Sequence, residues 1–182
     1  MKNQLLAGRY QDATWRPSPN YDARPPGSTV DLLVIHAISL PPGQFGGEYV
    51  DALFCNSLDY TAHPAFAILQ GLTVSAHFVI DRKGRLTQYV VTDQRAWHAG
   101  VSSFSGRAAC NDYSIGIELE GDDETPFETK QYERLATLSR TLMQAYPKIT
   151  AARVVGHADI APRRKTDPGP HFDWIRFRAS IT

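Results

Sequence analysis

The chain is 182 residues long and carries 19 basic and 19 acidic side chains, so its formal net charge is zero and its isoelectric point is near 7. This length suits one compact domain. The even charge balance disfavours a nucleic-acid-binding domain, which normally carries a basic excess, because the clustered cations are limited to Arg163, Arg164 and Lys165. No stretch approaches the roughly 20 apolar residues that a membrane span needs.

The N-terminus and the cysteines favour a cytoplasmic protein. The first residues lead into two leucines, Leu5 and Leu6, and not into the apolar core of a signal peptide. Cys55 and Cys110 are far apart and have no CxxC context, so two reduced thiols are expected. We expect a cytoplasmic protein, with a monomer as the default oligomeric state.

The N-terminal third contains an arm and then a strand. Residues 17–27 include four prolines, which predict an extended arm over residues 1–28 that packs on a domain of residues 29–182. Residues 31–36 form an apolar run of strand length, typical of a strand buried on both faces, with His36 as its last residue. A short helix is expected to begin at Tyr49.

Three further strands are predicted in the middle of the chain. Residues 73–81 and 85–91 form a hairpin whose turn includes Gly84, a residue suited to positive φ. Residues 114–120 alternate between apolar and polar side chains, which places Glu118 and Glu120 on one strand face. The apolar face is expected to join the core and the other face to be available for chemistry.

The C-terminal third adds helices and a last strand. Helical spacing of apolar residues predicts a helix over residues 129–146 with Thr129 as its N-cap, and a terminal helix is expected over residues 172–178. Residues 153–157 form a strand that ends on His157. Strands interrupted by helices predict an α/β fold, a single domain with a central mixed β-sheet flanked by helices. Both strand-end histidines then converge on one edge of the sheet, where ligands of open α/β sheets bind.

Three residues in these positions have the chemistry of a catalytic zinc site. His36, His157 and Asp167 provide two imidazoles and one carboxylate, and such a set leaves a coordination position open for water. Asp167 lies ten positions after His157 and directly before Pro168-Gly169, a tight turn that can hold a carboxylate still. Spacing alone leaves a structural role open for each histidine.

Longer motifs resemble a known family. Their order and spacing are similar to those of the zinc-dependent N-acetylmuramoyl-L-alanine amidases, whose superfamily also holds phage T7-type lysozyme and the peptidoglycan recognition proteins. The resemblance extends from about Tyr10 to Phe177. The motifs are VIH at 34–36, SAHF at 75–78, AWHAG at 96–100, NDYSIGIE at 111–118, GH at 156–157 and RKTDPG at 164–169. Residues 38–43, 51–54, 116–121 and 160–162 are similar to the cytosolic members that act on 1,6-anhydro-muropeptides in Gram-negative cell-wall recycling.

The resemblance implies an amidase/T7-lysozyme-like fold and an activity. Zn²⁺, one per chain, would be held by His36, His157 and Asp167. Glu118 matches the catalytic carboxylate, which takes a proton from the attacking water, and Lys165 matches a cation near the reacting carbonyl. The scissile bond would join the lactyl group of (1,6-anhydro-)N-acetylmuramic acid to L-alanine of the stem peptide, with an anhydro-muropeptide as substrate and neither nucleic acid nor membrane as partner.

Several roles stay open. Glu120 lies two residues, about 6.8 Å, beyond Glu118 on the same strand face and is the second candidate for the base, although the resemblance favours Glu118. His77 is expected to be a satisfied interior histidine. Trp97 and His98 are candidate substrate-binding residues, although Trp97 could equally belong to the core. Asp159, two residues after His157, is expected to cap its loop.

One position departs from the family pattern. Ala37 follows the first ligand where close relatives carry asparagine, so contacts to the stem peptide would be weaker or come from another group. Two different functions also stay open. One is a non-catalytic peptidoglycan-binding module, against which the intact ligand set argues. The second is an extracellular wall-degrading amidase.

Overall fold

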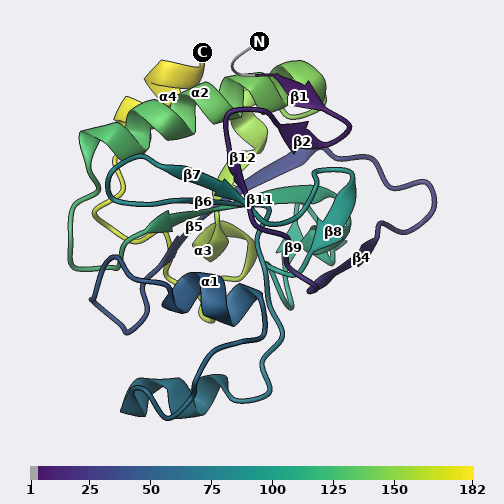
Figure 1. Cartoon of the computed structure of the whole chain (residues 1–182). Helices are drawn as coiled ribbons and strands as arrows, with labels where there is room; N and C mark the ends of the chain where they lie inside the picture. Colours follow the sequence, from purple (N-terminus) through teal and green to yellow (C-terminus); the bar gives the residue numbers. More distant parts are fainter. Residues whose placement is uncertain (1–3) are drawn as a thin grey trace.

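The computed structural model describes residues 4–182, and a six-stranded mixed sheet lies at its centre (Figure 1). Four neighbouring strands run parallel, the fifth is antiparallel to the fourth, and the sixth, at the edge, is parallel to the fifth. In spatial order they are β12 (Val154–Gly156), β5 (Leu32–Ile38), β11 (Ser114–Glu120), β6 (Phe78–Ile80), β7 (Leu86–Gln88) and β3 (Thr14–Trp15).

Helices cover both faces of this sheet. Helices α2 (Thr129–Ala145) and α4 (Trp174–Ile181) lie together over one face, and α1 (Tyr49–Phe54), the 3₁₀ turn η1 (Pro64–Leu69) and α3 (His157–Ile160) lie on the other side (Figure 1). The remaining elements are the strand pairs β1 (Leu5–Leu6) with β2 (Arg9–Tyr10), β4 (Tyr21–Ala23) with β8 (Gln94–Ala96), and β9 (Ser103–Phe104) with β10 (Arg107–Ala108), and the 3₁₀ turns η2 (Cys110–Asp112) and η3 (Ala151–Arg153). The predicted α/β architecture with a mixed sheet and flanking helices is confirmed.

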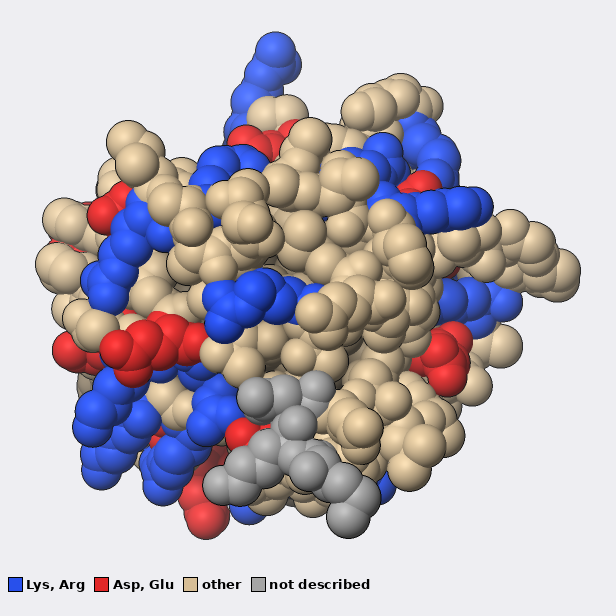
Figure 2. All heavy atoms as spheres, turned by 90° about the horizontal axis from the view of Figure 1, so that it is seen from above, with Lys and Arg blue, Asp and Glu red and all other residues tan. Residues whose placement is uncertain are grey.

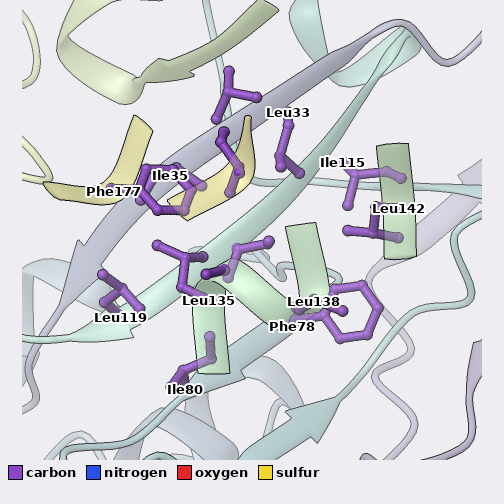
Figure 3. Packing of buried hydrophobic residues seen from close by; sticks show 14 of the residues in the cluster. Leu33, Ile35, Phe78, Ile80, Ile115, Leu119, Leu135, Leu138, Leu142 and Phe177 are labelled. Carbon is purple, nitrogen blue, oxygen red and sulfur yellow. The ribbon is translucent and has the colours of Figure 1, made fainter. Parts of the chain in front are cut away.

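The main core lies between the sheet and helices α2 and α4 (Figure 3). Alternate residues of β5 and β11 point into it, as the period of two predicts, and they meet the apolar stripe of α2. Fully buried members are Leu33, Ile35, Ile115, Ile117, Leu119, Leu135, Leu138, Leu142 and Phe177. The opposite side chains of β5, Leu32 and Val34, are buried in a second cluster, so this strand is covered on both faces as predicted.

Two sequence-based expectations about strand ends were wrong. β5 continues beyond His36 to Ile38, because its ladder with β11 extends as far as Glu120. β12 ends at Gly156 and His157 opens α3, since the Asp159 carboxylate accepts a hydrogen bond from the Gly156 N–H at 2.7 Å. All seven residues of β11 are buried, so its polar face is enclosed by loops and only a restricted region is left for chemistry.

Helix starts also differ from the predicted positions. The N-cap of α2 is Glu128 and not Thr129, because Gln131 accepts a hydrogen bond from the Glu128 N–H at 3.0 Å and donates one to the carbonyl oxygen of Glu120. This fully buried glutamine fixes the helix to the end of β11. Helix α4 begins two residues later than predicted, with Asp173 as its cap. Helix α1 begins at Tyr49 as predicted.

The predicted hairpin forms with shorter strands. β6 and β7 pair antiparallel, but each has three residues, and the segment before β6 makes isolated hydrogen bonds such as His77 N–H to the carbonyl oxygen of Gly116. Gly84 has φ +76°, and a Cβ there would lie 2.8 Å from the carbonyl oxygen of Lys130. Glycine is therefore required by both conformation and space.

The N-terminal segment is tied to the rest of the structure. β3 forms one edge of the main sheet, and Arg24 donates hydrogen bonds to the carbonyl oxygens of Asp112 and Ser114 at 3.1 and 2.9 Å. Residues 1–3 of the predicted arm lie outside the described residues, and the division at residue 28 stays a prediction. Within residues 4–182 no helix is both long and apolar enough to cross a membrane.

The surface charge is mixed, as the composition predicts. Figure 2 shows the face that carries α2 and α4, where basic side chains are spread over the surface with acidic side chains among them. Cys55 and Cys110 are both free thiols, as expected.

Candidate metal centre and active site

The register of three parallel strands brings the candidate residues together. β5 lies between β11 and β12, and the Cα partner of His36 in β11 is Glu118. On the other side, Gly156 pairs with Ile35, so His157 emerges next to His36. Because the strands are parallel, their carboxyl ends meet at the same edge of the sheet. The predicted convergence of the two histidines is confirmed by this register.

A turn after α3 brings Asp167 over the same edge. The Ala158 N–H donates to the carbonyl oxygen of Asp167 at 2.9 Å, and the Gly169 N–H donates to that of Thr166 at 3.0 Å. Gly169 has φ +85°, and a Cβ there would lie 2.4 Å from a carboxylate oxygen of Asp123. The Asp-Pro-Gly sequence thus folds into the tight turn that the motif predicts.

Three ligand-type atoms form a small triangle at this point. Nδ1 of His36 lies 3.0 Å from Nδ1 of His157 and 3.3 Å from Oδ2 of Asp167, and the latter two atoms are 3.0 Å apart. Ligand atoms of a tetrahedral ion bound at about 2.0–2.1 Å lie roughly 3.3 Å from one another. The set therefore fits three corners of a tetrahedral metal site, and among residues 4–182 no fourth His, Cys, Asp or Glu belongs to the group.

The protonation states of His36 and Asp167 favour the binding of a cation. Burial lowers the pKa of His36 to about 4, so its imidazole is neutral at physiological pH. Burial alone would raise the pKa of Asp167, but hydrogen bonds with His157 and His36 more than offset this and hold the pKa of its carboxyl below the usual range. The site therefore offers neutral imidazole and ionised carboxylate, the forms that bind metals.

The backbone carbonyl of Ala99 orients the ring of His157 on the side away from the triangle. Its Nε2 lies 3.2 Å from the carbonyl oxygen of Ala99. A carbonyl oxygen only accepts hydrogen bonds, so a proton on Nε2 pairs with Ala99, and in that tautomer Nδ1 has a lone pair for a metal.

Glu118 lies beside this triangle with an unpaired oxygen. Its Oε1 is 3.9 Å from Nδ1 of His36, and its Oε2 is buried without a hydrogen-bond partner among residues 4–182. Burial and the charge of Asp167 raise the pKa of Glu118 well above its usual value, although Lys165 lowers it. A buried carboxylate without partners is costly in a purely structural role and is typical of functional sites.

Glu120, Asp159 and His77 each have structural partners. The carboxylate of Glu120 accepts hydrogen bonds from the backbone N–H of Gly46 and, at 3.0 Å, from that of Arg82, so it anchors two loops. Asp159 caps the start of α3 as predicted. His77 is a buried, satisfied histidine, also as predicted, since its Nδ1 accepts from a backbone N–H of β11 at 3.0 Å and its Nε2 donates to a backbone carbonyl oxygen of β8.

A groove of about 830 Å³ lies beside the metal-type site and is lined by one of its three ligands, Asp167. Asp167 and Ala37 line it, and its walls carry charges of both signs, with Asp122, Asp123 and Glu124 and with Arg163, Arg164 and Lys165. Lys165 is exposed, and within residues 4–182 no acidic group lies within 4.0 Å of its ammonium. Its charge is thus available to a ligand in the groove.

Trp97 and His98 lie away from the groove walls, and His98 contacts the ring of His36. Neither is among the described residues that line this groove. The Trp97 indole N–H donates to the Asp22 carboxylate at 3.1 Å, while both ring nitrogens of His98 contact protein groups, His36 and Ser114. A substrate-binding role for the two residues stays a prediction, and for His98 no ring nitrogen is left to contact a substrate.

Sequence reasoning missed the groups that orient the histidine rings by hydrogen bonds on the side away from the triangle. These are the hydroxyl of Ser114 and the carbonyl oxygen of Ala99. Arg164 donates to the carbonyl oxygens of Ala99 and Val101 at 2.6 and 2.8 Å. Backbone carbonyls carry no residue-type signal, so no pattern in the sequence could have revealed them.

Comparison with known proteins agrees with this geometry. The family model described as N-acetylmuramoyl-L-alanine amidase matches residues 26–170. The chain belongs to this amidase family. It is 57% identical over 178 residues to the 1,6-anhydro-N-acetylmuramyl-L-alanine amidase AmpD of Citrobacter freundii. The matched region covers 98% of this chain and 95% of that protein.

Solved structures show the same relationship. A crystal structure of a selenomethionine AmpD derivative matches with a TM-score of 0.95 and 54% identity over 98% of this chain and 99% of that one. Escherichia coli AmiD, in complex with the substrate anhydro-N-acetylmuramic acid-L-Ala-D-gamma-Glu-L-Lys, matches with a TM-score of 0.61 and 31% identity over 86% of this chain and 60% of that one. The family and the fold inferred from the resemblance are confirmed.

The buried histidine His77 predicts a pH-dependent stability. Burial lowers its pKa to about 3, so below pH 6.5 the unfolded chain binds a proton that the folded chain cannot. On going from pH 7 to pH 5, metal-free protein should therefore lose about 2 kcal/mol more unfolding free energy than metal-free His77→Gln protein. Urea unfolding in the presence of a chelator measures this difference. Equal losses in both proteins would contradict a neutral buried His77.

Proposed function

We propose that this protein is a zinc-dependent amidase that hydrolyses the bond between the lactyl group of (1,6-anhydro-)N-acetylmuramic acid and L-alanine of the stem peptide. The observation that carries the proposal is the triangle of His36, His157 and Asp167 atoms with the unpaired buried oxygen of Glu118 beside it. Metal ligands and a carboxylate base at one sheet edge are the components of metal-assisted hydrolysis.

The ligand set suits one zinc ion per chain. Two imidazole nitrogens and one carboxylate oxygen are a known donor set for catalytic zinc, and the triangle's dimensions match tetrahedral coordination. When bound, zinc supplies Lewis-acid chemistry, which makes water more acidic and polarises a carbonyl group.

In this proposal, Glu118 takes a proton from water and later gives it to the alanine nitrogen. As the oxygen of water joins the lactyl carbonyl carbon, the Glu118 carboxylate takes one proton from that water. The proton then passes to the alanine nitrogen as the carbon–nitrogen bond breaks, so the Glu118 carboxylate is regenerated. The second water proton stays on the new muramic acid carboxyl group and then passes to the amine, which leaves a carboxylate and a peptide ammonium. Its buried position holds the base in place and raises its proton affinity, which helps the first transfer.

Lys165 is proposed to stabilise the negative charge that develops on the carbonyl oxygen. Its charge acts on both His36 and Glu118, which places it within electrostatic reach of the reacting groups. Because it has no acidic partner among residues 4–182, its ammonium is free to pair with the oxyanion.

The groove supports a muropeptide as substrate. A ligand of the type named in the AmiD complex carries carboxylates and a lysine ammonium, and the walls of this groove offer charges of both signs. The name of the similar AmpD proteins supports the 1,6-anhydro sugar. We further propose a cytoplasmic monomer that acts in cell-wall recycling, since the ligands, the base and the cation all come from one chain.

The first experiment follows peptide release by mass spectrometry from anhydro-muramyl-tripeptide. We expect release by the zinc-loaded protein, loss of release with a chelator, and recovery with zinc. Glu118→Gln should lower kcat by about 10²- to 10⁴-fold without loss of zinc, because proton transfer is removed.

Glu120→Gln is the matched control. It changes the neighbouring carboxylate on the same strand face, whose oxygens bond backbone N–H groups, so thermal stability should fall more than kcat. Binding of the substrate without any release by zinc-loaded protein would instead support a non-catalytic binding module. Release that persists in Glu118→Gln would remove Glu118 as the base.

A second experiment tests Lys165. Lys165→Met removes the charge and keeps the length of the side chain, so kcat should fall by about 10²- to 10³-fold while zinc content is unchanged. Arg163→Ala removes another exposed cation from the same groove and should affect KM more than kcat. A kcat for Arg163→Ala as low as that for Lys165→Met would indicate a general effect of groove charge.

A further inference from the structure

His98 lies behind the metal ligand His36, on the side of the ring opposite the donor triangle. Nδ1 of His98 is 2.9 Å from Nε2 of His36. Nε2 of His98 is 3.2 Å from the Ser114 hydroxyl oxygen, which lies 2.6 Å from the carbonyl oxygen of Cys110. These contacts form a chain of hydrogen bonds that runs from a backbone carbonyl to a metal ligand.

The carbonyl end sets the direction of every bond in the chain. A carbonyl oxygen only accepts, so the Ser114 hydroxyl donates its single proton to Cys110. The Ser114 oxygen then accepts from His98, whose proton is on Nε2. A neutral imidazole has one N–H, so Nδ1 of His98 accepts from Nε2 of His36. His36 is left with an unprotonated Nδ1, which faces His157 and Asp167.

His98 is neutral in this arrangement. Within residues 4–182, only His36 and His157 have a ring nitrogen within 4.0 Å of a carboxylate, so His98 has no acidic partner to stabilise a charge.

His36 needs a hydrogen-bond acceptor at Nε2 because Asp167 favours the tautomer of His36 that carries its proton on Nδ1. Oδ2 of Asp167 is 3.3 Å from Nδ1 of His36, so the carboxylate attracts a proton to that nitrogen. A proton there would occupy the lone pair that a metal requires. An acceptor at Nε2 opposes this effect from the other side of the ring.

The ring of His98 is held by its surroundings. A Cβ on Gly116 would lie 2.4 Å from Cγ and 2.6 Å from Nδ1 of His98, so the imidazole packs directly against the backbone of β11. The backbone N–H groups of His98 and Ala99 both donate to the side-chain oxygen of Asn111, at 3.1 and 2.8 Å. The absence of a side chain at Gly116 thus provides the space in which His98 reaches His36.

We propose that His98 is a positioning residue that accepts a hydrogen bond from Nε2 of His36 and thereby fixes the tautomer whose Nδ1 binds the metal. The inference rests on the proposed zinc site. His157 has the equivalent support from the carbonyl oxygen of Ala99, so each imidazole ligand is oriented by a separate acceptor.

The direct test is nuclear magnetic resonance of protein labelled with ¹⁵N in its histidine rings. We expect a scalar coupling across the hydrogen bond between Nε2 of His36 and Nδ1 of His98, with the proton attached to His36. A proton attached to Nδ1 of His98, or no coupling between the two nitrogens, would overturn the inference. The measurement needs no turnover, so it is independent of whether the protein cleaves muropeptides.

Two variants of equal shape give the second test. Asparagine and leucine have the same branched arrangement of heavy atoms, but only asparagine offers an oxygen near the place of the His98 Nδ1. His98→Leu should weaken zinc binding by about 10- to 100-fold in competition with a chelator, and His98→Asn should retain most of the affinity. Parental affinity in His98→Leu, or an equal loss in both variants, would contradict the proposal.

The ring of His157 is the internal control for these variants. Its proton should stay on Nε2 in both, because its acceptor is a backbone carbonyl that the substitutions do not touch. Failure of the parent protein to release peptide, with these results intact, would count against the proposed reaction and leave the role of His98 standing.

Discussion

The site depends on the parallel pairing of β5 with a strand on each side. This pairing places Glu118 directly beside His36 on one side and lets His157 emerge beside it on the other. A shift of one residue in the β5–β11 register would move Glu118 out of line with His36, and a shift of one residue along β5 would turn His36 into the opposite face. The fully buried apolar residues of β5 and β11 resist such shifts, so the packing of the core against α2 also maintains the geometry of the metal-type ligands.

The same packing imposes an electrostatic cost. His36 is fully buried and Glu118 nearly so, and the carboxylate of Asp167 lies within 3.3 Å of both ligand histidines. Two imidazole nitrogens and a carboxylate oxygen lie within 3.3 Å of one another, and an oxygen of Glu118 has no partner in the part of the chain that the structure describes. The proposed zinc ion would offset this cost, and the proposed proton transfer would account for a carboxylate oxygen without a partner. The hydrogen bond at Nε2 of His157 ends on the carbonyl oxygen of Ala99, and the chain from Nε2 of His36 through His98 and Ser114 ends on that of Cys110.

The sequence was sufficient for the residues whose side chains follow a strict pattern or motif. Alternation over residues 114–120 located β11 to the residue, and the Asp-Pro-Gly motif located the turn at Asp167. It was insufficient where tertiary contacts decide the outcome. Gln131 moves the cap of α2 to Glu128 through its contact with β11, and Asp159 ends β12 one residue early. His98 has the same residue type whether it contacts a substrate or supports a ligand, and only the position of its ring beside Gly116 distinguishes the two.

In the proposed site, three protein atoms hold one zinc ion and leave a position open for chemistry. Anomalous diffraction at the zinc absorption edge from crystals of the zinc-loaded protein tests this most directly. We expect one zinc site per chain, bound by Nδ1 of His36, Nδ1 of His157 and a carboxylate oxygen of Asp167 at about 2.0–2.2 Å, with solvent in the remaining position. Coordination by a fourth protein side chain, or a zinc ion held by Nε2 of His36, would contradict this arrangement.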